Sequence, residues 1–153
     1  MAILSWGKGT LETCDSVGGA PATTNPAWKT IDTPKENTLK LTPTAGQEVT
    51  ATEEGGEIVD SRNGKTTFVL EFDLFVKKGV DRPWDDEDGL ITGEHAFRYT
   101  PEDTSTEGFL IERSTVRCEE SYTTADGKLL HYTVRVLKPK TGKSLKKYQA
   151  AKN

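Results

Sequence analysis

The sequence is poor in the residue types that build catalytic and metal sites. Its 153 residues include two cysteines, two histidines and one methionine. Cys14 and Cys118 lie far apart with no second cysteine nearby, which predicts separate thiols in a reducing compartment, although the sequence also permits a bridge between them. His95 and His131 have no second ligand at metal-binding spacing, whereas a structural zinc site needs four close ligands. We therefore expect no metal, no cofactor and no enzymatic activity.

Long apolar runs are missing too, and the mean hydropathy is −0.61. No run of about 18 apolar residues predicts a membrane span, and the first residues lack the basic leader and apolar stretch of a secretory signal. Lysine plus arginine number 20 against 24 acids, a net charge of −4, which disfavours a basic nucleic-acid-binding protein. We therefore expect neither a membrane partner nor sequence-specific binding to nucleic acid.

Threonine is abundant, with 22 residues. Its β-branched side chain fits a half-buried pleated surface better than a helix. Fourteen glycines and seven prolines supply turns, and the length suits one domain. The composition predicts a single all-β domain over residues 1–153, mainly antiparallel, folded as a β-sandwich or partly closed barrel with at most one short helix.

Alternation of apolar and polar residues locates the strongest strand, from Lys65 to Lys77. A period of two over this length indicates one buried face. The side chains expected to point inward are Phe68, Leu70, Phe72, Leu74 and Val76. Asn63-Gly64 predicts a hairpin turn that leads into this strand from a shorter strand at 57–62, because glycine tolerates the positive φ of such turns.

A second hairpin is predicted around Asp126-Gly127, between strands at 109–123 and 128–137. Its inward side chains are expected to be Leu110, Val116, Cys118, Tyr122, Leu130, Tyr132, Val134 and Val136. Weaker strands are expected at 2–6, 10–15, 28–31, 37–42, 46–53 and 94–100. The interior helix candidate is Pro101–Glu107, with proline and acids in its first turn.

Charge is unevenly distributed along the chain. Residues 79–127 carry a net charge of −9 and residues 128–153 a net charge of +8, so the near-neutral total combines an acidic middle with a basic C-terminal tail at 138–153. The most acidic loop consists of Asp85, Asp86, Glu87 and Asp88. An irregular calcium site in this loop is an alternative to a solvated loop, because an EF-hand would need an oxygen ligand where Trp84 stands.

The chain resembles the tail-tube structural proteins of phages and prophage elements in segments that follow one another in order. These segments are AILSWGKGTLE, EEGGE, TFVLEFDLFVKKG, DGLITGEHAFRYTPED, GFLIERSTV and YTTADGKLLHYTVRVLKPKTGK. The resemblance implies a β domain that forms hexameric rings, which stack into a tube whose lumen passes the tape-measure protein and then DNA. Its partners would be further copies of itself and other tail proteins, in the host cytoplasm during assembly and then in the virion tail.

The stretch Gly46–Lys65 has few apolar residues to anchor it in a monomer core. Unpaired strand edges promote aggregation unless another strand pairs with them. We therefore expect this stretch to project and to complete a neighbouring subunit's sheet, with its acidic side toward the lumen. A solvated hairpin is the alternative. The tail lysines are expected to contact the acidic loop of another subunit. The interface candidates are Glu48, Thr50, Thr52, Glu54, Glu57, Asp85, Asp86, Glu87, Asp88, Lys138, Lys140, Lys143, Lys146 and Lys147.

A monomeric β-sandwich module that binds carbohydrate or calcium is the alternative function. Trp6, Trp28 and Trp84 stand near predicted loops or strand ends, where aromatic rings can form a platform for a sugar. Packing in the core or at an edge is the competing interpretation for each of them, because apolar area is scarce in this sequence.

Overall fold

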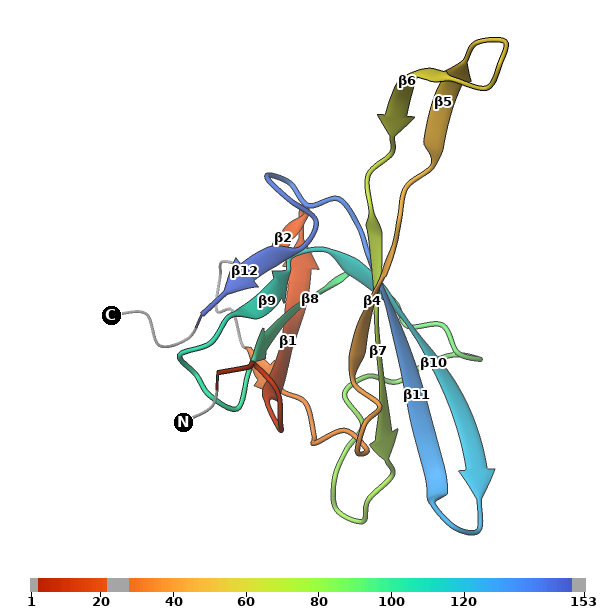
Figure 1. The fold of residues 1–153 in the computed structure, drawn as a ribbon. Helices are drawn as coiled ribbons and strands as arrows, with labels where there is room; N and C mark the ends of the chain where they lie inside the picture. Colours follow the sequence, from red (N-terminus) through yellow and green to blue (C-terminus); the bar gives the residue numbers. More distant parts are fainter. Residues whose placement is uncertain (1–2, 22–27, 150–153) are drawn as a thin grey trace.

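The fold is seen in a computed structural model that describes residues 3–21 and 28–149 (Figure 1). Every regular element in these residues is a β-strand, and every strand pairing is antiparallel. The strands are β1 (Thr10–Val17), β2 (Ala20–Pro21), β3 (Lys29–Thr30), β4 (Lys40–Thr44), β5 (Glu48–Thr52), β6 (Ile58–Asn63), β7 (Thr67–Phe75), β8 (His95–Thr100), β9 (Gly108–Ile111), β10 (Ser114–Thr123), β11 (Gly127–Val136) and β12 (Lys146–Tyr148). The predicted all-β, mainly antiparallel class is confirmed.

Two sheets form the body of the molecule. The first has the order β12-β9-β8-β1-β2, with β3 also on β1, and the second has the order β10-β11-β7-β4. One apolar cluster lies between them, with Leu11, Phe97 and Ile111 from the first sheet and Phe72 and Tyr132 from the second. This is the arrangement expected of a β-sandwich or partly closed barrel.

The predicted inward parity is confirmed for the central strands. Leu70, Phe72 and Leu74 of β7 are at most 2% exposed. The residues paired with them on β11 in the same sheet are equally buried: Val134, Tyr132 and Leu130. Three inward predictions are wrong. Val76 is 47% exposed and Tyr122 is 71% exposed, and Leu110 lies outside the core cluster because its neighbours Phe109 and Ile111 contact the core instead. Val76 follows the last residue of β7, and Tyr122 lies at the outer end of β10, where no facing sheet covers them.

Three predictions of local structure are corrected. Phe109 belongs to β9 in the first sheet, so the strand predicted at 109–123 is divided between two sheets. Pro101–Glu107 contains no helix, because the Asp103 carboxylate accepts the Ser105 N–H at 3.0 Å and holds a turn instead. Residues 3–6 carry no strand, and residue 2 lies outside the described residues. No described helix is long and apolar enough to cross a membrane.

The C-terminal region is more than a tail. Lys146–Tyr148 pairs with β9 as the edge strand of the first sheet, so the predicted tail at 138–153 is bound to the body in its second half. Residues 150–153 lie outside the described residues. Lys146 and Lys147 therefore lie on a strand that is paired with the body.

The two cysteines are buried thiols in different sheets, Cys14 in β1 and Cys118 in β10. Burial raises the pKa of Cys118 to about 11, and the nearby charge of Asp86 adds to the shift. A thiol with this pKa is almost wholly protonated at pH 8, and the thiolate is the reactive form.

We therefore expect native protein to react only slowly with iodoacetamide at pH 8, and unfolded, unreduced protein to titrate two thiols. Mass spectrometry of the alkylated protein measures both states. Finding no thiol after unfolding would show instead that the two cysteines are bridged.

Candidate assembly surfaces

The most unusual feature is a two-stranded arm, β5 and β6, which extends away from both sheets (Figure 1). The arm continues the β4–β7 hairpin. Pairing runs from Lys40↔Glu71 to Thr44↔Thr67 in the body and resumes in the same register from Glu48↔Asn63 to Ala51↔Asp60 in the arm. One long hairpin therefore contributes two strands to the second sheet and then leaves it.

Two glycines allow the strands to approach closely where the arm leaves the body. A Cβ atom on Gly46 would lie 2.2 Å from the carbonyl carbon of Gly64, and the Gly64 N–H donates to the Gln47 carbonyl at 2.8 Å. The prediction of a hairpin turn at Asn63-Gly64 is therefore wrong. The chain does not reverse at Gly64; a Cβ atom there would lie 3.0 Å from the backbone nitrogen of Gln47 on the neighbouring strand.

Every residue of β5 and β6 is exposed, which fits the predicted projection of Gly46–Lys65. Val49, Ile58 and Val59 are 53%, 63% and 57% exposed. Burying apolar side chains such as these would lower the free energy. Two strands alone are marginally stable in water. The arm thus has unpaired strand edges and exposed apolar side chains, and it is anchored where its two strands continue into β4 and β7.

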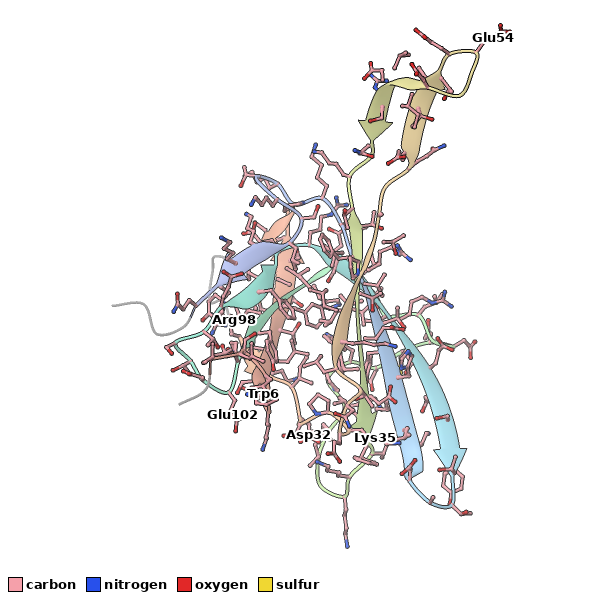
Figure 2. All side chains as sticks on the ribbon, viewed as in Figure 1. Trp6, Asp32, Lys35, Glu54, Arg98 and Glu102 are labelled. Atoms are coloured by element: carbon pink, nitrogen blue, oxygen red, sulfur yellow. The ribbon has the colours of Figure 1, made fainter. Side chains whose placement is uncertain are left out.

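The predicted arm residues divide between a strand face and the tip. Glu48, Thr50 and Thr52 alternate along β5 and share one face. Glu54 lies instead in the tip turn (Figure 2). Glu57 closes this turn, because its carbonyl accepts the Glu53 N–H at 2.9 Å. The structure therefore places three predicted residues on the strand face and two at the far end of the arm.

One residue of the acidic loop at 85–88 makes contacts within its own subunit. The Asp86 side chain is only 6% exposed; one carboxylate oxygen lies 3.4 Å from Arg82, and the other accepts the Gly89 N–H at 2.9 Å. Asp86 is therefore bound within its own subunit, and its expected contact with a neighbour stays a prediction. Asp85, Glu87 and Asp88 are exposed. Nowhere in the described part of the chain do three or more His, Cys, Asp or Glu side chains gather as metal ligands.

The predicted lysines also divide into two groups. Lys146 binds the Glu112 carboxylate of its own subunit, and its expected contact with another subunit stays a prediction. Four exposed lysines form no ion pair among the residues that the structure describes: Lys138, Lys140, Lys143 and Lys147. We call residues 138–147 the basic segment.

The tryptophans differ in environment. Trp84 packs edge-on against Phe97 and Tyr132, with ring centroids 5.6 and 5.4 Å apart, so it acts as a core residue. The Arg98 guanidinium lies 4.3 Å from the centre of the Trp28 ring. Trp6 is 70% exposed. The structure therefore does not bring the three rings together as one platform.

A charged cluster that the sequence analysis missed lies on the outer face of the second sheet. His131 Nδ1 is 2.5 Å from Asp73 Oδ1, and Nε2 is 3.4 Å from Glu71 Oε1; Glu119 stands opposite on β10. Burial lowers the pKa of His131, but the hydrogen bonds and charges of Asp73 and Glu71 together outweigh it and raise that pKa. Only the strand register reveals this cluster, because its members are distant in sequence.

The raised pKa of His131 makes stability depend on pH. Below the unfolded pKa of about 6.5, His131 is charged in both states and the ion pairs contribute fully. Their contribution is lost as pH rises through the folded pKa. We expect urea unfolding to show wild type losing more stability from pH 6 to pH 8 than a His131→Asn variant loses. Equal losses in the two proteins would refute a role for His131.

No protein-family model matches this chain, and no curated protein sequence matches it.

Proposed function

We propose that this protein is a structural subunit of a phage or phage-like tail tube, which assembles into hexameric rings that stack around a lumen. The observation that carries the proposal is the arm. It is a fully exposed extension of the body sheet, with apolar side chains that no other described residue covers. The ordered sequence segments that resemble tail-tube proteins supply the kind of assembly.

The arm favours contact between copies because both edges of its two strands are open within the described residues. Open edges bind further strands through main-chain hydrogen bonds. An arm that binds a different surface of the next copy makes a head-to-tail contact, and such contacts close into rings when the rotation permits. A ring is therefore one assembly that this shape allows, and the resemblance to tail-tube proteins favours it.

The chemistry of β5 suits a surface that faces passing DNA. Glu48, Thr50 and Thr52 share one face, and that face carries no lysine or arginine on β5. An acidic or neutral lining repels phosphates and so lets DNA slide without binding. In this role the protein has no enzymatic activity; its partners are other copies and other tail proteins, first in the host cytoplasm and then in the virion tail.

The proposal is tested by measuring molar mass against concentration with multi-angle light scattering. We expect the mass to rise from the monomer to a hexamer or a larger polymer. A monomer at every concentration, stabilised by an added oligosaccharide or by Ca²⁺, would favour the binding-module alternative and reject the tube.

A further inference from the structure

The basic segment is a cationic surface without an acidic partner. Lys138, Lys140, Lys143 and Lys147 are exposed and form no ion pair within residues 3–21 and 28–149. Elsewhere in the body, Arg98 binds Glu12 at 2.9 Å and Arg113 binds Glu94 at 2.8 Å. Other basic side chains without an ion pair in these residues are scattered along the chain, at Lys8, Lys29, Arg62, Lys65, Lys78, Arg117 and Arg135. The basic segment is where four of them lie close together in sequence.

The backbone at the start of this segment is hydrogen-bonded to the body. The Lys140 N–H donates to the Gly19 carbonyl at 2.8 Å, the Leu137 N–H donates to the Arg113 carbonyl at 2.9 Å, and Pro139 is buried. Beside it lies a hollow of about 230 Å³. Its lining residues are Gly18, Gly19, Glu94, Arg113, Lys138, Pro139 and Lys140. Because Arg113 neutralises Glu94, the two lysines give the hollow its net positive charge.

The arm tip has the complementary charge. Glu53, Glu54 and Glu57 flank the Gly55-Gly56 turn, and none of the three forms an ion pair with another described residue. Glu54 stands at the extreme end of the arm, well apart from the body (Figure 2). The tip therefore projects away from the body, whereas the basic segment lies on the body beside the first sheet.

We propose that the acidic arm tip of one subunit docks on the basic segment of a second copy. The inference rests on the proposed function and names the surface that receives the arm. Within one subunit the tip and the segment form no ion pair, so the unpaired charges are satisfied between copies. Because tip and segment are different surfaces, each docked pair leaves one of each open for the next subunit.

This pairing replaces the contact expected between the lysines and the acidic loop at 85–88. Asp86 is already bound to Arg82, and the bridge Leu90↔Arg117 holds the loop against β10. The arm instead carries its three glutamates away from the body. Of the two acidic surfaces, the arm tip is the one that stands away from the body.

The test is a charge swap, with assembly measured by light scattering against concentration. One variant carries Glu53→Lys, Glu54→Lys and Glu57→Lys; the other carries Lys138→Glu, Lys140→Glu, Lys143→Glu and Lys147→Glu. Each should raise the concentration needed for half-assembly by at least about tenfold, because like charges then face each other. Joining both sets in one chain should restore assembly. The control variant Asp85→Lys, Glu87→Lys and Asp88→Lys should assemble as wild type; rescue of the lysine-reversed protein by this set would overturn the proposal.

Carbodiimide cross-linking of mixed ¹⁵N-labelled and unlabelled wild type separates this inference from the proposed function. Mixed-isotope peptide pairs that join 53–57 to 138–147 show docking between copies. Assemblies without such pairs would reject the docking and leave the tube proposal in place. Such pairs without any ring would support the docking and reject the tube, whereas neither assemblies nor pairs would reject both.

Discussion

Replacing Phe72 with alanine should destabilise the fold by about 3–5 kcal/mol, the usual cost of removing a buried aromatic ring. Phe72 is fully buried in the middle of β7, and its ring centroid is 5.4 Å from that of Tyr132 on β11. Its loss leaves a cavity between the two sheets. Because domains have only about 5–15 kcal/mol of stability, this single change removes a large part of it. Urea unfolding followed by tryptophan fluorescence measures the effect.

Val76→Ala is the matched control, since it shortens an apolar side chain of the same predicted parity that the structure leaves 47% exposed. It should change stability by no more than about 0.5 kcal/mol. A small effect of Phe72→Ala, or equal effects of the two substitutions, would contradict the core described here.

Replacing residues 45–66 with Asn-Gly should abolish assembly and leave the body folded. Thr44 and Thr67 are paired directly, so a two-residue turn can close the β4–β7 hairpin at that point. None of the removed residues belongs to the core, and shortening a loop changes stability only slightly. We expect a monomer at concentrations where wild type assembles, with an unfolding free energy within about 1 kcal/mol of wild type.

Circular dichroism and urea unfolding of the same preparation establish that the armless protein is folded. A second control keeps the arm and replaces Gly55-Gly56 with Asn-Gly, the residue pair that most readily adopts two successive positive φ angles. If the armless protein assembled like wild type, the arm would have no part in the interface.

The local pattern was sufficient to predict the centre of the sandwich. A period of two in β7, β10 and β11 identified the residues that are buried, because each strand has one face on the core. The same alternation did not predict burial correctly at the strand ends. Val76 and Tyr122 continue the pattern, but burial there depends on how far the facing sheet extends, and the strand itself does not encode that.

Features that depend on distant partners were also missed. Asn63-Gly64 has the sequence of a hairpin turn, yet the register with β4 and β5 extends past it, and Gly64 serves the close approach of another strand. Likewise the sequence places Lys146 in a basic tail, whereas in the structure its ammonium group is bound by the Glu112 carboxylate. The projecting arm was predictable from its low apolar content, because too few side chains were present to hold it on the core.

Negative-stain electron microscopy of concentrated wild type and of the armless protein, side by side, tests the central claim most directly. We expect wild type to show rings with a central hole, stacked into short tubes at the highest concentration, and the armless protein to show only small separate particles. Wild-type fields that contain only monomer-sized particles at every concentration would contradict assembly through the arm.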